Sequence, residues 1–546
     1  MKNVIGPGLR IGSFGPWVRA YFVRATVAAS VSLVAMQGFG QFLSYMKSFG
    51  GPNEEFALHV LPVNDAQGGH ILVGQTGSYG QAAANTSPNA YILRTDESGS
   101  RLWSISAGGS GYDYLNMVAE TTDGWLVVGA TVNSGGLYSD VLLMRISTSG
   151  ALIWTKRIGT PEQNEVGDHI LALGGDQFMI TGSRFITGGG SDGDVFVMKI
   201  NGQGEVLWSS LVGSDRQDDP NAITTTADGG FLIAGTRTTL PTQQAFLFKL
   251  DGDGGLVWER TWQALQGSVT ITRLIPSADG GSILTGQSSG LQVMKLDDTG
   301  DVVWSRAYQQ GAYISGVSLG SFGEDGYLIV GATSNPDFSL PRMMALRIDG
   351  LGEVVEARSY AGDLGNANGR SAVVEAEGGI TMVGSLSTGG GDVLLVRTQV
   401  GDDGLGALCN EQQETVTTTT PVAFNVVNGL YAALNPISPV TSSLSWVVNS
   451  STTETTYCSN VSVPELQEPA QQLIAFPNPT AGPLTIQWPS WSDHRLVELM
   501  DSSGRVVLST RAHGSATLDV SMLAGGPYIV RVSNDRSVLY GVFMVQ

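Results

Sequence analysis

Few residues of this chain have the types and spacing that a known chemistry requires. Its 546 residues include only five histidines and two cysteines. No two histidines form an HxH or HExxH pair, and the two cysteines do not have the spacing of zinc ligands. We therefore expect structural roles for the histidines, which are His59, His70, His169, His494 and His513.

One GxSxG sequence, at 286–290, could suggest the nucleophile of a hydrolase. A nucleophile elbow joins a strand to a helix, whereas the apolar run LQVMKL follows this sequence. We interpret it as a turn between two strands, and we assign no catalytic residue. Pairs of carboxylates for glycoside hydrolysis stay open, because their separation cannot be read from a sequence.

Two segments rich in glycine and aspartate, 188–194 and 251–254, contain the oxygen ligands that calcium prefers. Neither matches an EF-hand loop, so we interpret both as turns. Calcium is the one cofactor that these residues leave open, and we assign no metal ligand. The chain contains no Walker motif, and its GxGxxG sequence at 188–193 lies in a segment that we interpret as a turn, so we assign no cofactor-binding residue either.

The composition favours an extracellular, all-β protein. Only 14% of the residues are charged, 73 are glycine, and the formal net charge is −20. Many glycines and few charges indicate many turns and few surface helices. The negative charge argues against nucleic acid as a partner and against electrostatic docking on anionic lipid.

A repeat of about 50 residues organises the middle of the chain. Its first element is a short apolar run that ends in glycine, and the seven copies of this glycine lie 45 to 55 residues apart. These repeat glycines are Gly74, Gly129, Gly182, Gly235, Gly286, Gly331 and Gly384. Each is expected to allow either a close approach of two backbones or a positive φ.

Two further elements follow each repeat glycine. The second is an apolar run with one basic residue, such as Arg94 in AYILRT, and the third follows a turn and carries a tryptophan. The tryptophans are Trp103, Trp154, Trp208, Trp258 and Trp304. Glu356 stands at the tryptophan position of the sixth copy, and the seventh copy is degenerate. We expect the tryptophans to pack against the neighbouring repeat, and the basic residues to lie along the surface with their charge in water.

Four strand-like runs in each repeat predict one blade of a β-propeller, because a weaker apolar run precedes each glycine element. Seven copies predict a closed seven-bladed β-propeller over residues 41–410. We expect Phe42–Gly51 to supply the last strand of the last blade, so that both ends of the ring share one sheet. The pattern resembles a family of exported bacterial propellers, which indicates architecture and says little about activity.

Both ends of the chain are predicted to carry targeting signals. Residues 1–40 have basic residues followed by the apolar run ATVAASVSLVAM, which is typical of a secretory signal peptide and too short to span a membrane. Residues 411–473 form a Thr- and Ser-rich segment and a linker. Cys409 and Cys458 bracket the first part, and export makes a disulfide between them plausible.

Residues 474–546 have a different pattern, with the alternation of half-buried strands in a small β-sandwich. Three motifs occur in order: PNPTAG, then DSSGR in a hairpin, then LAGGPY. Their residues are Pro477, Asn478, Pro479, Gly482, Asp501, Gly504, Arg505, Leu523, Gly525 and Tyr528. These motifs resemble the type A C-terminal sorting domain of the type IX secretion system. The resemblance implies the secretion machinery as a partner, and a secreted protein or one attached to the outer-membrane surface.

Three functions are compatible with these features. The first is a binding or adhesion propeller without catalysis, whose glycan or protein ligand would contact variable loops such as 76–90 and 183–194. The second is a hydrolase or lyase acting on an extracellular polymer, which convergent carboxylates with raised pKa values would favour. The third is a quinoprotein, because residues 296–304 resemble a quinoprotein repeat, although seven copies depart from the usual eight blades.

Overall fold

The computed structural model divides into two compact units, Phe42–Val461 and a C-terminal unit within Ser462–Gln546. It describes residues 43–545 except for 80–86, 110, 133–137, 161, 186–192, 265–266, 289, 310–313, 324, 336–338, 362–363, 376–377, 388–390, 402–403, 406–407, 409–410, 414–416, 420–423, 427–431, 435–439, 444–452, 462–473, 477–481, 489–494, 502–504 and 534–537. The signal peptide predicted for residues 1–40 lies outside this part of the chain. Every regular element of the described residues is a strand, and none of them forms a helix that could cross a membrane.

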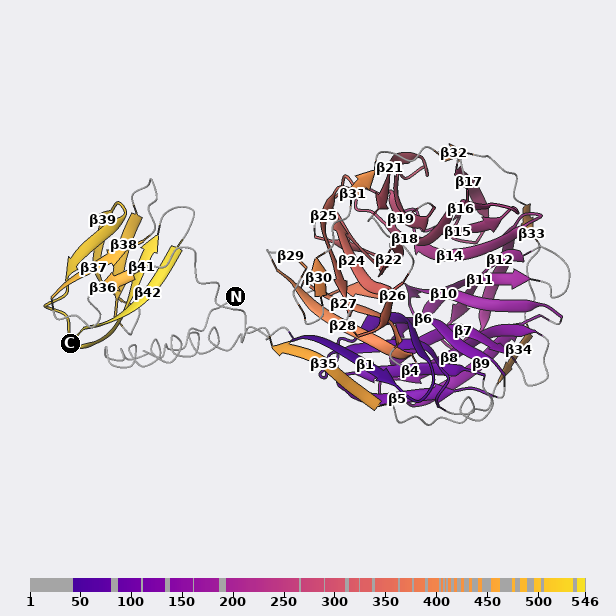
Figure 1. Cartoon of the computed structure of the whole chain (residues 1–546), viewed down its shortest axis with the longest axis horizontal. Coiled ribbons are helices and arrows are strands. Elements are labelled where there is room, and N and C mark those ends of the chain that lie inside the picture. Colours follow the sequence, from indigo (N-terminus) through magenta and orange to yellow (C-terminus); the bar gives the residue numbers. More distant parts are fainter. Residues whose placement is uncertain are drawn as a thin grey trace, which may run out of the picture. The chain divides into compact units, whose positions relative to one another are not determined.

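Four-stranded antiparallel sheets form the first unit, and their inner strands lie around a common centre (Figure 1). We call these sheets blades 1 to 7. In blades 1 to 4 the strands run β2 (Glu55–Pro62), β3 (His70–Thr76), β4 (Asn89–Thr95), β5 (Arg101–Ala107); β6 (Asp113–Thr121), β7 (Gly124–Val132), β8 (Ser139–Ser147), β9 (Leu152–Gly159); β10 (Asn164–Gly174), β11 (Gln177–Phe185), β12 (Gly193–Asn201), β13 (Val206–Gly213); and β14 (Gln217–Thr225), β15 (Phe231–Thr238), β16 (Gln243–Leu250), β17 (Leu256–Ala264).

Blades 5 to 7 continue the same order from the inner to the outer strand. Their strands are β18 (Thr270–Pro276), β19 (Ser282–Gln287), β20 (Leu291–Leu296), β21 (Val302–Gln309); β22 (Ile314–Phe322), β23 (Gly326–Thr333), β24 (Arg342–Ile348), β25 (Val354–Tyr360); and β26 (Asn366–Val374), β27 (Gly379–Ser387), β28 (Asp392–Gly401), β1 (Leu43–Gly50). Apolar residues of adjacent blades pack together, as when Ile71 of β3 and Val127 of β7 share one cluster.

The two ends of the ring meet in blade 7. Strand β1 pairs antiparallel with β28, with Tyr45 opposite Arg397, as the sequence predicts. Across the junction, His70 of blade 1 contacts Glu375 of blade 7 at 2.9 Å. Closure turns the inner edge of every blade toward the centre of the ring, where the edge is protected.

A belt of short strands, within residues 411–461, runs along the outer strands of the blades. It visits them in the reverse of chain order, as Figure 1 shows at the periphery of the ring. The pairs are β30 (Glu411–Gln413) with β25, β31 (Thr417–Thr419) with β21, β32 (Phe424–Val426) with β17, β33 (Ala432–Leu434) with β13, β34 (Val440–Ser443) with β9, and β35 (Thr453–Val461) with β1. The short β29 (Gly404–Leu405) precedes the belt and pairs with β28.

The belt differs from the separate segment that the sequence suggests for residues 411–473. Outer strands have an unpaired edge, and any extended segment can supply the missing backbone partners. Backbone pairing does not require the same side chains at each contact. The belt therefore has no repeated sequence pattern from which it could be predicted. Cys458, in β35, takes part in a disulfide, whereas Cys409 lies outside the described residues, so their pairing stays a prediction.

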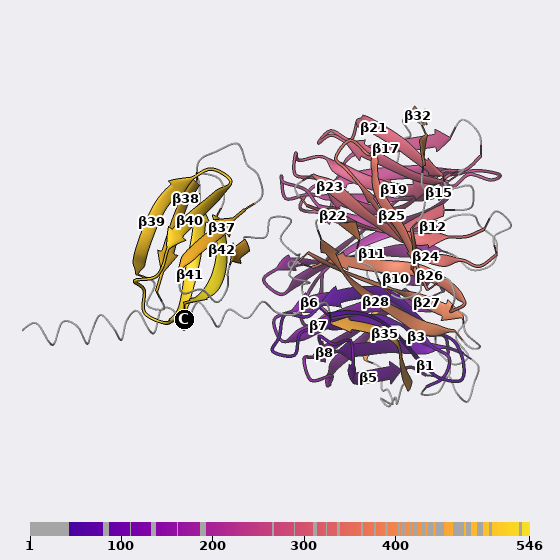
Figure 2. The same cartoon turned by 60° about the vertical axis from the view of Figure 1, so that its left-hand side comes forward.

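The C-terminal unit is a β-sandwich of two antiparallel sheets (Figure 2). Leu484 of one sheet and Val497, Val530 and Phe543 of the other share a single buried core. One sheet contains β36 (Ile474–Phe476), β37 (Pro483–Gln487) and β40 (Ser515–Asp519), and the other contains β38 (Arg495–Met500), β39 (Val506–Ala512), β41 (Gly526–Ser533) and β42 (Val538–Val545).

Candidate functional site

The inner strand of every blade contains an extra residue relative to its partner strand, at an equivalent place in each blade, and β10 contains a second one, Leu173. In blade 2, for example, Leu115 pairs with Gly129 and Met117 pairs with Val128, so Asn116 is left over. Such a β-bulge turns the side chain of the extra residue away from its usual direction. The seven bulge residues are Leu58, Asn116, Asp168, Asn221, Thr272, Val317 and Arg370.

The bulges explain the repeat glycines. A Cβ atom on Gly129 would lie 1.9 Å from the carbonyl oxygen of Tyr114, just before the bulge, and the other six repeat glycines face an equivalent oxygen at 1.7 to 2.2 Å. None of the seven has a positive φ. Of the two roles that the sequence leaves open, the structure therefore shows the close approach of two backbones.

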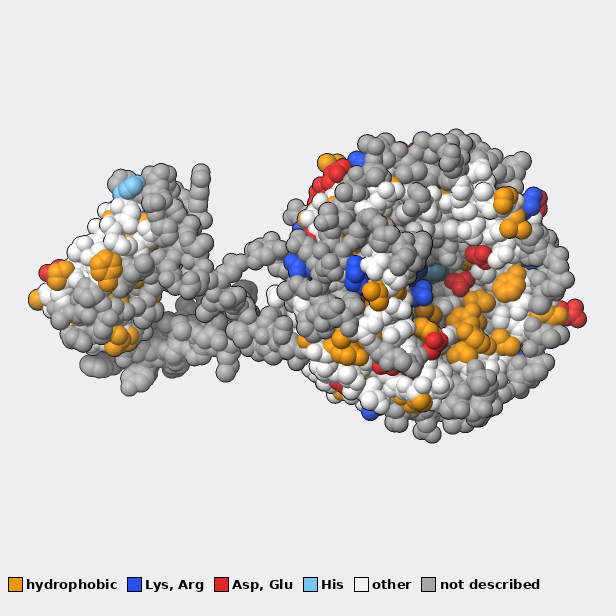
Figure 3. All heavy atoms as spheres, viewed as in Figure 1, with side chains coloured by type: hydrophobic (Ala, Val, Ile, Leu, Met, Phe, Trp, Pro, Cys, Tyr) orange, Lys and Arg blue, Asp and Glu red, His pale blue; other side chains and the backbone are white. Residues whose placement is uncertain are grey.

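All seven bulge residues line one cavity of about 260 Å³, which we call the central channel. His169 and Arg273, each one residue beyond a bulge, line it as well. Figure 3 shows the ring hollowed near its centre, with acidic, basic and histidine side chains inside the hollow.

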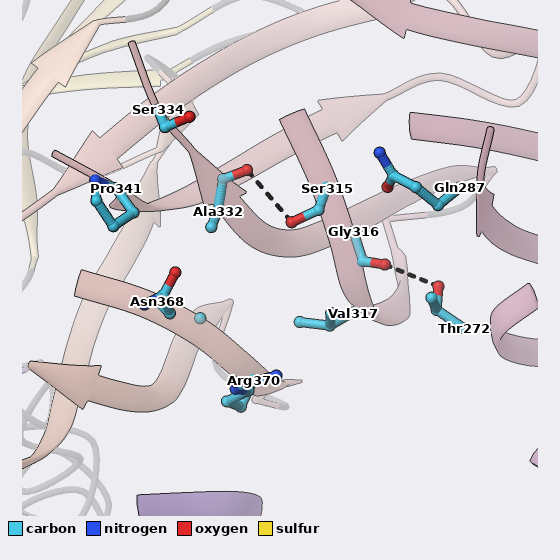
Figure 4. Close-up of a pocket in the computed structure, with 11 residues that line it drawn as sticks. Thr272, Gln287, Ser315, Gly316, Val317, Ala332, Ser334, Pro341, Asn368 and Arg370 are labelled. Atoms are coloured by element: carbon cyan, nitrogen blue, oxygen red, sulfur yellow. Dashed lines mark hydrogen bonds between the residues drawn. The ribbon is translucent and has the colours of Figure 1, made fainter. Parts of the chain in front are cut away.

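A second cavity, of about 410 Å³, adjoins the central channel between blades 5, 6 and 7. The two share Thr272, Val317 and Arg370. Figure 4 shows Val317 between Arg370 and Thr272, and the Thr272 hydroxyl donates to the carbonyl oxygen of Gly316 at 2.7 Å. The combined space falls within the size range of small-ligand sites.

Asp168 is the acidic group of the channel. Its Oδ2 accepts a hydrogen bond from the Ser183 hydroxyl at 3.2 Å, and its Oδ1 lies 3.4 Å from Nδ2 of Asn116. Burial, assisted by the negative charge of Asp219, raises the pKa of Asp168 to about 7. Burial also raises the pKa of Asp219, to which Ser183 is hydrogen-bonded as well.

Arg273 is the basic group in the depth of the channel. Its Nη1 lies 3.2 Å from Nε2 of His169 and donates to the carbonyl oxygen of Asn221 at 3.2 Å. Burial and the Arg273 charge lower the pKa of His59 to about 3 and lower the pKa of His169 as well. Both histidines are therefore neutral, and Nε2 of His169 can accept a hydrogen bond from the guanidinium of Arg273.

The basic residues of the repeat are placed differently from the surface position that the sequence suggests. Five of them are only 1 to 7% exposed, and each contacts a carboxylate at 2.6 to 3.0 Å. We call these five residues the framework cations: Arg94, Arg145, Lys249, Lys295 and Arg397. The expectation of a solvated charge was wrong, because carboxylates of nearby hairpin turns replace the water around these cations. The remaining two, Lys199 and Arg347, are half-buried.

Each repeat tryptophan lies against the next blade. Trp208 of blade 3, for example, contacts Gly254. Gly254 lies in the turn between the third and fourth strands of blade 4 and has a positive φ of 86°. Tyr45 of β1 takes the equivalent place against Gly99 of blade 1. Because β28 and β1 are not joined by such a turn, blade 7 offers no turn glycine to Glu356, which instead accepts a hydrogen bond from the backbone N–H of Leu405. The other contacts of this type are Trp103 with Gly150, Trp154 with Gly204, Trp258 with Gly300 and Trp304 with Gly352.

Several other sequence candidates do not line the channel at the residues that the structure describes. Gly286 and Gln287 end strand β19, and Ser288 and Gly290 lie between it and β20. Asp251 closes a turn by accepting hydrogen bonds from the N–H groups of Asp253 and Gly255. Among the described residues no group of three or more His, Cys, Asp or Glu could hold a metal. Residues 80–86 and 186–192 of the two candidate loops, and His494, lie outside the described residues.

Sequence reasoning missed the bulge residues. A usable signal was present, because five of them lie 14 residues before their repeat glycine. Apart from this spacing the bulge position has no recognisable pattern, because its residue type changes from blade to blade.

The motifs of the C-terminal unit have structural roles where they are described. Asp501 and Arg505 close a hairpin, with the Arg505 N–H donating to Asp501 Oδ1 at 3.1 Å. The Tyr528 hydroxyl donates to the carbonyl oxygen of Ala524 at 2.9 Å, and Leu523 packs against the core. Pro477, Asn478, Pro479 and Gly504 lie outside the described residues; Gly482 immediately precedes β37, and Gly525 precedes β41.

Solved structures similar to this chain share little sequence with it. A protein of unknown function from Bacteroides caccae has 12% identity and a TM-score of 0.28, covering 61% of this chain and 93% of its own. Sqt1 from Chaetomium thermophilum has 12% identity and a TM-score of 0.40, covering 65% and 98%. An engineered GH43 glycoside hydrolase has 11% identity and a TM-score of 0.25, covering 71% and 91%. At these scores the similarities carry no argument about function.

The comparisons with protein sequences give one match. No curated protein matches the chain. A family model described as "Secretion system C-terminal sorting domain" matches residues 474–546. This is the unit whose motifs resemble the type A sorting domain, and such domains direct a protein to the type IX secretion machinery. Residues 474–546 therefore belong to the type IX sorting domains, and the chain is exported to the cell surface or the extracellular space.

Proposed function

We propose that this exported protein is a binding or adhesion protein that holds a polar ligand in the central channel without converting it. One observation carries the proposal: seven structurally equivalent bulge residues line one cavity, and they are chemically diverse. They comprise two apolar residues, three neutral polar residues, one acid and one base.

The diversity of these positions is what a ligand site requires. The bulge itself recurs in all seven blades, so the backbone holds each side chain at an equivalent place around the axis. A small number of polar groups on a rigid scaffold fixes the orientation of a ligand, and apolar groups beside them bury its surface. Leu58 and Val317 are the apolar members here.

A steric plug tests the proposal. The full chain would be screened against a panel of glycans and extracellular polymers, with binding and product formation measured together. Val317→Trp fills the space shared by the two cavities and is expected to weaken binding at least about tenfold. Val303→Trp, on an outer strand at a residue that is 59% exposed, is the matched control and should bind normally. Equal binding by both variants would place the ligand outside the channel.

A second candidate is a hydrolase or lyase acting on an extracellular polymer. Asp168 and Asp219 favour it, because the pKa of both carboxyls is raised and one serine contacts both. A carboxyl group with a pKa of about 7 is protonated at slightly acid pH and can donate its proton to a leaving group.

The same screen separates the two functions. Turnover that falls as the pH rises above about 7, and that Asp168→Asn abolishes, would support the hydrolase. Binding with no product, retained in Asp168→Asn, would support the binding protein.

A further inference from the structure

Among the described residues, two arginines of the central channel have no carboxylate partner of the kind that the framework cations have. Arg273 and Arg370 both line the cavity, and no described carboxylate lies within ion-pairing distance of either. An enclosed charge is costly unless it is paired, so the guanidinium of Arg273, which is half-buried in the cavity, points to a partner that arrives from outside.

Arg273 keeps part of its hydrogen-bonding capacity unused. Its Nη1 contacts only neutral acceptors, namely His169 and the carbonyl oxygens of Asn221 and Thr272. The described residues provide no partner for its Nη2 or Nε. An arginine that presents two N–H groups in one plane matches a carboxylate or a sulfate group.

Arg370 offers a second positive charge in the lining of the same cavity. It is exposed, it belongs to both cavities, and Figure 4 shows it next to Val317. The whole chain carries a net charge of −20, whereas these two side chains of the cavity are positive and have no described carboxylate partner. Their charge would favour the binding of an anion there.

The other walls of the channel suit hydroxyl groups. Asn116 and Asn221 use their Nδ2 atoms within the protein, donating to Gly167 and Thr236, while the described residues leave both Oδ1 atoms without a donor. An amide oxygen accepts hydrogen bonds from hydroxyl groups. Leu58 and Val317 add an apolar surface against which the C–H face of a sugar ring can lie.

We propose that the channel binds an acidic saccharide, with Arg273 and Arg370 holding its carboxylate or sulfate group and the asparagine amides accepting hydrogen bonds from its hydroxyls. This inference rests on the proposed function of the channel as a ligand site, and it adds the chemical class of the ligand.

The experiment compares matched ligands on the full chain. An array would carry neutral saccharides together with their uronic-acid and sulfated counterparts, and the tightest binder would then be titrated by calorimetry. Acidic members are expected to bind at least about tenfold more tightly than their neutral counterparts, and the uronate and sulfate arms identify which group is held.

Arginine variants locate the effect. Arg273→Gln and Arg370→Gln are each expected to weaken acidic ligands at least about tenfold and to leave neutral ligands almost unchanged. Arg260→Gln removes the same charge from an outer strand, where Arg260 stacks on Trp258, and should change neither. Because Arg370 is exposed, its variant reports on binding even if Arg273→Gln disturbs the fold.

Each outcome decides between the two proposals. Binding of neutral saccharides that Val317→Trp blocks and both glutamine variants retain would overturn the acidic ligand and keep the channel as a site. Binding of acidic saccharides that neither arginine variant weakens would overturn this assignment. Binding that Val317→Trp does not affect would overturn the channel itself.

Discussion

The inner and outer strands of the blades use repetition in opposite ways. At the outer strands the same pair recurs, a tryptophan against the turn glycine of the next blade, as in Trp208 with Gly254. At the inner strands only the backbone recurs, as a bulge over the repeat glycine, and the bulge side chain differs from blade to blade. The comparison teaches that repeated side chains join neighbouring blades, whereas a repeated backbone with variable side chains lines the central channel.

The largest effect is expected where the inner backbone is closest. Gly129→Ala would place a Cβ atom 1.9 Å from the carbonyl oxygen of Tyr114, so one of the two strands must move. We expect a loss of about 3 kcal/mol or more in the free energy of unfolding, measured by chemical denaturation. Gly109→Ala is the control, because nothing lies within 4 Å of its Cβ position. Equal stability of the two variants would show that the repeat glycine is not needed for the bulge.

A smaller loss is expected at the outer strands. Trp208→Ala removes a half-buried ring from the contact with Gly254, and we expect the free energy of unfolding to fall by about 2–3 kcal/mol, with ligand binding unchanged. Asn116→Ala, at a bulge, should do the reverse and alter binding at a cost of less than about 1 kcal/mol. If Trp208→Ala abolished binding while the ring stayed folded, the division between framework and site would fail.

The smallest effect depends on pH and comes from His59, which follows the bulge residue Leu58 in the chain. The pKa of His59 is lowered to about 3, and its Nδ1 has no described hydrogen-bond partner, so the folded state resists protonation while the unfolded state binds a proton below about 6.5. The free energy of unfolding therefore falls as the pH drops below about 6.5, because protons then bind His59 in the unfolded state but not in the folded state. Relative to His59→Asn, the natural chain should lose up to about 2 kcal/mol between pH 7 and pH 5.

Denaturation curves of the two proteins at each pH measure this difference. Other groups with shifted pKa values, such as Asp168, are present in both proteins and cancel in the comparison. Parallel pH dependence of the two chains would contradict a neutral, enclosed His59.

Much of the fold could be predicted from the sequence, because the repeat makes each blade visible several times. The pairing of β1 with β28 follows from the resemblance of Phe42–Gly51 to the tryptophan run. The framework cations could not be placed in the same way. Arg94 occurs within a strand pattern that fits a solvated stem equally well, and only the hairpin that carries Asp65 decides that it is buried and paired.

The candidate site was harder to predict. Asp168, Arg273 and Arg370 come from three different blades, and none stands at a position whose residue type repeats. The belt could not be predicted for a related reason, because backbone hydrogen bonds place few demands on the type of side chain.

The sequence alone therefore determined the repeating strands, the closure of the ring by its first strand, and the sorting domain with its destination, because each depends on local patterns or on motifs of fixed spacing. Only the tertiary structure decided which carboxylates neutralise the framework cations, where the belt lies, and that two arginines with no described carboxylate partner line one channel. Those features depend on distances between residues far apart in the chain, and such distances exist only once the blades have packed around their common centre.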